Sequence, residues 1–180
     1  FKILGKNFNS VAERVWLKRR FKQYKIEDRD LAKLKMRMDI IPVSIAIAQA
    51  ANESGWGTSR FALEGNALFG QWTWSKKGIL PKDQDPNQTH KVMQFQILKA
   101  SVRAYKNNLN THNAYKEFRE KRAQLRQQEK QILGLDLTKY LKNYAAIGEK
   151  YVVILEDIIN RNSLTDFDTA NLLPTKLKKG

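Results

Sequence analysis

The sequence predicts a mainly helical (α+β) domain that carries one small, irregular β lobe. Apolar residues recur at helical spacing along most of the 180 residues. The stretch 71–97 breaks this pattern, because it is rich in proline, glycine and polar residues and then alternates, with Met93, Phe95 and Ile97 on one face. With 42% hydrophobic residues and no long apolar run, the chain predicts a globular domain rather than a disordered or membrane-spanning one.

Two helices are predicted before the first proline of the chain. Ser10 and Glu13 have the spacing of a capping box, so a first, basic helix should run over about 10–24. A second helix should begin at about Asp28, with Asp28 or Asp30 near the positive end of the helix dipole, and end near Pro42.

The segment 43–53 fits two kinds of secondary structure. Its Val and Ile residues alternate as in a strand, but the alanines between them make every side apolar. The length of the segment and its four alanines favour a buried helix that ends near Glu53, with Pro42 in its first turn.

Helices resume after the β lobe, and 116–131 should form a charged, solvated one. Two helices are marked by stripes at helical spacing, one of Val102, Tyr105 and Leu109 and one of Tyr115, Phe118, Arg122 and Leu125. Two further helices are predicted over 137–143 and 149–161. We expect a single domain over 1–162, with the basic helix of 1–27 packed on it, the β lobe at 71–97, and a loosely attached C-terminal tail at 163–180.

The net charge of +15 predicts attraction to a polyanion, although a basic surface can also serve solubility alone. Lysine and arginine are frequent before residue 40, whereas the window 40–75 holds a single cation, Arg60. That window is rich in aromatic residues: Trp56, Phe61, Phe69, Trp72 and Trp74. Aromatics without interleaved cations predict a neutral, stackable ligand such as a sugar ring, and not a nucleic acid.

The sequence predicts no metal and no cofactor. It has no cysteine, and its two histidines, His90 and His112, are far apart and have no companion at the spacing of metal ligands. We therefore expect both histidines to be ordinary surface residues.

Glu53 is the leading candidate for chemistry. It ends an apolar run and is followed by Gly55 and Gly57, which can stop a helix. The negative end of the helix dipole and apolar neighbours both raise the pKa of a carboxyl group. A carboxyl that stays protonated near neutral pH can donate a proton to a leaving sugar oxygen. The structural alternative is that Glu53 caps a neighbouring helix or pairs with Arg60.

The motif ESGWG, followed by NALFG, resembles the signature of the bacterial peptidoglycan glucosaminidases, glycoside hydrolase family 73. The similarity runs over about 28–160 and is greatest to the Bax-type proteins of Gram-negative bacteria. It implies a lysozyme-like helical domain whose β lobe lies beside the active-site groove. It also implies cleavage of the β-1,4 bond after N-acetylglucosamine in peptidoglycan.

The resemblance assigns roles to individual residues. Glu53 matches the general acid, and Asn66, Phe69 and Gly70 match a second motif that lines the groove. For Phe69, and for Trp56 of the first motif, packing beneath the site is the favoured alternative. Trp72 and Trp74 alternate in a polar stretch and should face one side, where they can stack on sugars or pack in a core.

Two tyrosines near the C-terminus correspond in part to the family pattern Y-A-T-D-x-x-Y. Here the segment reads YAAIGEKY, from Tyr144 to Tyr151. The resemblance implies that Tyr144 faces the acid. The spacing to Tyr151 differs by one residue, so it is a substrate-binding candidate for which a core position is the favoured alternative.

The second catalytic group is open on the sequence. Two carboxylates about 5 to 9.5 Å apart are usual in glycosidases, but Asp83 and Asp85 are the only acids between Gly65 and Leu109. They can position a water molecule, or they can be ordinary turn residues. Alternatively, the N-acetyl group of the substrate supplies the nucleophile and Tyr144 steadies its charge, which is the interpretation we favour.

The expected partner is the glycan strand of peptidoglycan, bound by a monomer. The intact protein should be exported to the periplasm or cell envelope, and the basic surface suits peripheral association with the wall or membrane. The alternatives are cleavage on the N-acetylmuramic acid side, a non-catalytic glycan-binding module, and a nucleic-acid binder attracted by charge alone.

Overall fold

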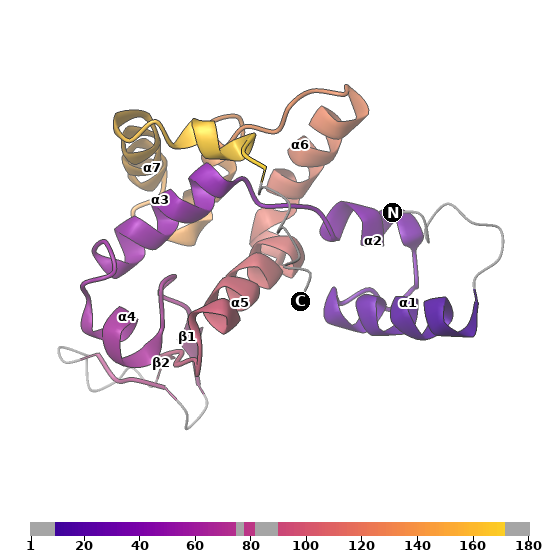
Figure 1. The fold of residues 1–180 in the computed structure, drawn as a ribbon, viewed down its shortest axis with the longest axis horizontal. Coiled ribbons are helices and arrows are strands. Elements are labelled where there is room, and N and C mark those ends of the chain that lie inside the picture. Colours follow the sequence, from indigo (N-terminus) through magenta and orange to yellow (C-terminus); the bar gives the residue numbers. More distant parts are fainter. Residues whose placement is uncertain (1–9, 75–77, 82–89, 172–180) are drawn as a thin grey trace, which may run out of the picture.

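The computed structural model describes residues 10–74, 78–81 and 90–171, which form a mainly helical domain with one small antiparallel sheet (Figure 1). This architecture confirms the predicted fold class and fits the lysozyme-like arrangement that the resemblance implies. The elements, with η for 3₁₀ helices, are α1 (Val11–Gln23), α2 (Leu31–Arg37), α3 (Val43–Ser54), α4 (Arg60–Gly65), β1 (Trp72–Thr73), β2 (Lys91–Val92), α5 (Leu98–Thr111), η2 (Asn113–Tyr115), α6 (Lys116–Gln127), η3 (Thr138–Tyr144), α7 (Glu149–Arg161) and η4 (Leu164–Asp168).

The first two helices begin at side-chain caps. The Ser10 hydroxyl accepts a hydrogen bond from the Glu13 amide at 3.2 Å, and the Glu13 carboxylate accepts one from the Ser10 amide at 2.8 Å, so the predicted capping box is confirmed. Helix α2 starts later than predicted, because Asp30 rather than Asp28 caps it by accepting from the Ala32 amide. None of the helices in the described ranges is long and apolar enough to span a bilayer.

Helices α1 and α2 form an arm at one end of the molecule (Figure 1). A small apolar cluster joins them and is separate from the main core; its buried members are Leu17, Phe21, Tyr24, Ile26 and Leu34. Helix α2 in turn packs against α6. The predicted basic N-terminal helix is therefore present, and in the described residues it is joined to the domain through α2.

Helix α6 holds the arm to the domain through a buried arginine. The fully buried Arg122 side chain donates hydrogen bonds to the Ile40 and Met36 carbonyls and to the Asn110 side chain. Its Nε lies 3.7 Å from the Asp39 carboxylate, which offsets the buried charge. The predicted stripe of Phe118, Arg122 and Leu125 is thus confirmed as the buried face of this helix.

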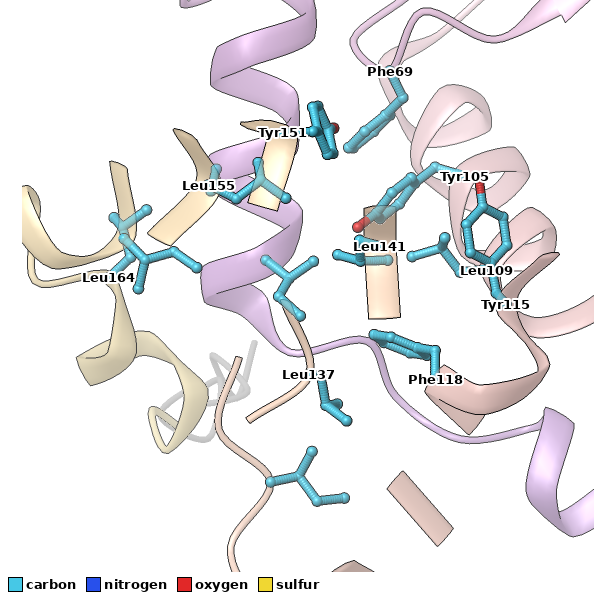
Figure 2. Close-up of a cluster of buried hydrophobic side chains, with 14 of the residues drawn as sticks. Phe69, Tyr105, Leu109, Tyr115, Phe118, Leu137, Leu141, Tyr151, Leu155 and Leu164 are labelled. Atoms are coloured by element: carbon cyan, nitrogen blue, oxygen red, sulfur yellow. The ribbon is translucent and has the colours of Figure 1, made fainter. Parts of the chain in front are cut away.

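Helix α3 lies at the centre of the main core, as predicted for a buried helix (Figure 1). Helix α7 and the η4 turn pack against it. Side chains from α5, α6, η3 and α7 converge on one cluster, as Figure 2 shows for Tyr105, Phe118, Leu141 and Leu155. Burial on several sides explains why its sequence is apolar all round.

Among the described residues, the strands of the β lobe cover only a part of the predicted segment 71–97. Trp72 pairs with Val92 and Thr73 with Lys91, and Ile79 adds an isolated bridge to Val92. Ile97 precedes α5 and is exposed, so the predicted alternating face does not extend to it.

The described part of the C-terminal segment, 163–171, packs against the domain, which corrects the prediction of a loose tail for these residues. Leu164 is buried in the main core. The Asp168 carboxylate accepts hydrogen bonds from the Ser44 amide at 2.9 Å, the Ser44 hydroxyl at 2.7 Å and the Gly134 amide at 2.8 Å. Asp168 thereby satisfies a free amide in the first turn of α3, which the cap residue Pro42 leaves without a side-chain bond.

We expect Asp168→Ala to lower the free energy of unfolding by about 2 kcal/mol, because three donors lose a charged acceptor. For a chain of this size, that loss lowers Tm by about 4 to 8 °C. Thermal and urea unfolding measure the effect. Asp166→Ala is the matched control, since its side chain is exposed and its loss should cost less than about 0.5 kcal/mol. Equal stability of the two variants would contradict the prediction.

Candidate active site

A groove of about 640 Å³ runs past the C-terminal end of α3. Its walls come from the β lobe, from the end of α5 with η2, and from the η3–α7 connection. The predicted site residues that line it are Glu53, Phe69, Gly70, Trp72, Trp74 and Tyr144. The structure thus brings together residues from four separate parts of the chain.

Glu53 reaches the groove because α3 stops directly after it. The helix ends at Ser54, and Gly55 takes the left-handed conformation with φ of +57°, as predicted. Gly70 faces the carboxylate from the other side: it also has φ of +57°, and a Cβ there would lie 3.0 Å from Oε2 of Glu53. A glycine at this position therefore allows the chain to approach the acid closely.

Burial dominates the electrostatics of Glu53. Its Oε1 accepts hydrogen bonds from the Tyr151 hydroxyl at 2.8 Å and from the Asn52 side chain at 3.2 Å. Burial raises the pKa of Glu53 above its usual range, and these two bonds only partly offset the rise. The alternative pairing with Arg60 is wrong, because Arg60 lies beside Glu64 and donates to the Leu80 carbonyl.

Tyr144 lies in the groove near the carboxyl of Glu53, as expected, but Tyr151 is the tyrosine that makes the hydrogen bond to it. The Tyr144 hydroxyl instead donates to the Phe69 carbonyl at 2.8 Å. The two phenol rings are stacked with centroids 5.6 Å apart, so Tyr144 lies in the groove wall beside the Tyr151–Glu53 contact. Tyr151 belongs to the first turns of α7, which begins at Glu149 and faces α3. It is both a core aromatic, as favoured, and a partner of the acid.

The two lobe tryptophans are exposed in the groove. Trp72 and Trp74 expose 59% and 75% of their surface, so the core-packing alternative is wrong for both. Trp72 stacks on His90 with ring centroids 4.0 Å apart. Trp56 is 62% exposed and does not line the groove among the described residues, so it does not pack beneath the site as expected.

Two residues of the second motif, Phe69 and Asn66, stabilise the fold around the groove. Phe69 is 3% exposed and stacks on Tyr105 with ring centroids 3.9 Å apart, which confirms the packing alternative. Asn66 ends α4 in the left-handed conformation, and its side chain donates to the Phe95 carbonyl at 2.9 Å. It therefore joins α4 to the lobe and does not line the groove as expected.

Sequence reasoning missed part of the groove wall: Gln71, Met93, Asn108, His112 and Tyr115. His112, expected to be an ordinary surface residue, accepts a hydrogen bond from the Ala114 amide and faces the groove. Asn108 lies in the last turn of α5 and His112 directly follows that helix, so helical spacing does not reveal that both line the groove. Burial raises the pKa of Tyr115 to about 12, with a smaller contribution from the charge of Glu53.

Glu53 is the only carboxylate among the described residues of the groove. The other candidates, Asp83 and Asp85, lie outside the described residues. Within the described ranges, no group of three or more His, Asp or Glu side chains is placed to hold a metal ion.

Comparison with known proteins identifies the family. Residues 29–164 match the glucosaminidase model, described as mannosyl-glycoprotein endo-beta-N-acetylglucosaminidase. The chain belongs to this glucosaminidase family of glycoside hydrolases. It is 38% identical to protein Bax of Escherichia coli K12 over 148 residues, which are 79% of this chain and 53% of Bax. The chain thus spans about half the length of that relative, and no solved structure matches it.

We expect Glu53→Gln to stabilise this glucosaminidase domain increasingly as pH rises. Because the native pKa of Glu53 is raised, the native state holds this proton more tightly than the unfolded state does. The wild-type stability therefore falls as pH rises from the usual glutamate range through the raised pKa, and a neutral amide removes that loss. Urea unfolding between about pH 4 and pH 8 measures the difference. Glu64→Gln, at an exposed site, should show no such trend.

Proposed function

We propose that this chain is a peptidoglycan glucosaminidase in which Glu53 is the general acid. The observation that carries the proposal is a half-buried carboxyl with a raised pKa at the wall of an aromatic groove. A raised pKa favours the protonated form of the carboxyl, which is the form that can deliver a proton to the leaving oxygen of a sugar. Family membership supports the peptidoglycan glycan as the substrate class.

The composition of the groove favours a neutral sugar. Trp72 and Trp74 present their rings to solvent along it, and aromatic rings stack well on the apolar faces of pyranoses. Among its described residues the groove has no lysine or arginine. Binding there depends on stacking and hydrogen bonds, with Asn108 and Gln71 as polar contacts, and not on attraction of an anion.

We propose that the N-acetyl group of the substrate acts as the nucleophile. Its carbonyl oxygen would attack the anomeric carbon as Glu53 protonates the leaving oxygen. The single carboxylate among the described groove residues supports this route. The competing route, with a water molecule placed by Asp83 or Asp85, predicts that replacing both aspartates with asparagine abolishes turnover, whereas the substrate-assisted route predicts that turnover persists.

The intact protein would act outside the cytoplasm, where its substrate lies. The α1 helix carries several cations, including Lys18, Arg19 and Lys22, and these could hold the enzyme to an anionic envelope surface. Cleavage next to N-acetylmuramic acid remains the alternative activity, because the same acid could serve either bond.

The deciding experiment is digestion of purified peptidoglycan, followed by borohydride reduction and mass spectrometry of the fragments. Reduced N-acetylglucosamine ends support the proposal, and reduced N-acetylmuramic acid ends favour the muramidase. If the protein sediments with the wall but releases no fragment, it is a glycan-binding module.

We expect Glu53→Gln to lower kcat by about 10² to 10⁴-fold, the usual contribution of a general acid. The amide keeps the size of the side chain and can still accept from Tyr151. Wall binding, measured by co-sedimentation, should therefore persist while fragment release is lost. Activity within about tenfold of wild type would rule out Glu53 as the acid.

We expect Trp72→Ala and Trp74→Ala each to raise KM about fivefold or more, because each removes a stacking surface worth about 1 kcal/mol or more. Initial rates on soluble glycan fragments of stated length measure the effect. Trp56→Ala is the matched control: it removes an equally exposed tryptophan that does not line the groove. A similar rise in KM for all three variants would contradict the assignment.

A further inference from the structure

A chain of buried hydrogen bonds ends on the proposed acid. The Tyr105 hydroxyl donates to Oε1 of Gln49 at 2.8 Å, and Nε2 of Gln49 donates to the Tyr151 hydroxyl at 2.9 Å. The Tyr151 hydroxyl then donates to Oε1 of Glu53 at 2.8 Å. Tyr105, Gln49 and Tyr151 are each 1% exposed or less, so water does not compete for these bonds. Figure 2 shows Tyr105 and Tyr151 in the same core cluster.

The chain has a direction, because the Gln49 amide has one donating end and one accepting end. With its carbonyl on Tyr105, its NH₂ group must face Tyr151. The oxygen of Tyr151 accepts that bond, so its only proton points to Glu53. An inverted amide would draw the Tyr151 proton away from the acid and leave the acid to donate inward.

The two oxygens of Glu53 therefore differ. Oε1 accepts from both Tyr151 and Asn52. Oε2 has no hydrogen-bond partner among the described residues, and it lies toward Gly70 at the groove wall. A proton on Oε1 would meet two donors that already point at that oxygen, whereas Oε2 is free to carry it.

We propose that the Tyr105–Gln49–Tyr151 chain is a positioning device that keeps the proton of Glu53 on Oε2, the oxygen that faces the groove. The inference rests on the proposed role of Glu53 as general acid. Gln49 and Tyr105 are positioning residues, because neither contacts the groove; they act through Tyr151. A buried amide and two buried hydroxyls are retained in the core because they fix the direction of one proton.

Few other groups can perturb this arrangement. The titratable side chains that face Glu53 are the phenols of Tyr151, Tyr144 and Tyr115. His112 lies in the groove wall, and no lysine, arginine or aspartate among the described residues lines the groove. A change in the titration of Glu53 can thus be traced to the hydrogen-bond chain.

The test is Tyr105→Phe, which removes one hydroxyl that does not contact Glu53. The Gln49 carbonyl loses its donor, so the amide can invert and accept the Tyr151 proton. Oε1 then loses its strongest donor, which raises the pKa of Glu53. Because the protonated acid is the active form, the descending limb of the kcat/KM profile moves to higher pH. We expect kcat to fall about tenfold with KM unchanged, because part of the acid now holds its proton inward.

Tyr24→Phe is the matched control, because it removes the same atom from a buried tyrosine in the arm. The double variant Gln49→Met with Tyr105→Phe removes both partners of one bond, which limits the loss of stability. Because no amide carbonyl is left to accept the Tyr151 proton, its kcat/KM profile should move less than that of Tyr105→Phe. Circular dichroism and thermal unfolding show whether each variant is folded.

The outcomes separate this inference from the proposed function. If Tyr105→Phe keeps the wild-type pH profile of kcat/KM and the wild-type kcat while Tyr151→Phe shifts that profile, Gln49 and Tyr105 serve packing alone and the inference fails. It also fails if the double variant shifts the profile as far as Tyr105→Phe does. If Glu53→Gln remains active, the proposed function fails instead. ¹³C NMR titration of the Glu53 carboxyl, in wild type and in Tyr105→Phe, then still decides whether the chain controls the proton.

Discussion

The hydrogen bond between the Tyr151 hydroxyl and the Glu53 carboxylate is the contact on which the site depends. It joins α7 to the end of α3 across 98 residues of sequence. For Tyr151 to reach the acid, both helices must pack through their apolar faces, and the core cluster brings them together. The carboxyl is consequently half-buried beside aromatic side chains at the groove wall. Its raised pKa is thus a product of the packing of the whole domain.

Helix α3 is held at both ends, which fixes the position of Glu53. At its first turn Asp168 accepts from the Ser44 amide and hydroxyl. At its last turn Gly55 adopts the left-handed conformation that stops the helix. The same principle recurs at Arg122, whose buried guanidinium bonds to carbonyls before α3. In both cases a charged side chain bonds to groups far away in the sequence and so ties separate segments of the domain together.

The burial of Glu53 lowers the stability of the native state. A half-buried carboxylate destabilises the native state once it ionises, and the pKa of Glu53 is raised for this reason. The buried amide and hydroxyls behind it add further polar groups to the core, which an apolar core would not need. Under the proposed role of Glu53 as general acid, the same burial that favours its protonated form lowers the stability of the domain at higher pH.

The sequence by itself determined the local features of this protein. The capping box at Ser10, the buried helix that stops after Glu53 and the alternation of Trp72 and Trp74 depend on residues close together in the chain. Only the tertiary structure decided that Tyr151 and not Tyr144 makes the hydrogen bond to the acid, that Asp168 caps α3, and that Asn108 and His112 line the groove. Periodicity and capping act over a few residues and can be read from spacing. Contacts between segments about 100 residues apart depend on how the helices pack, which spacing does not encode.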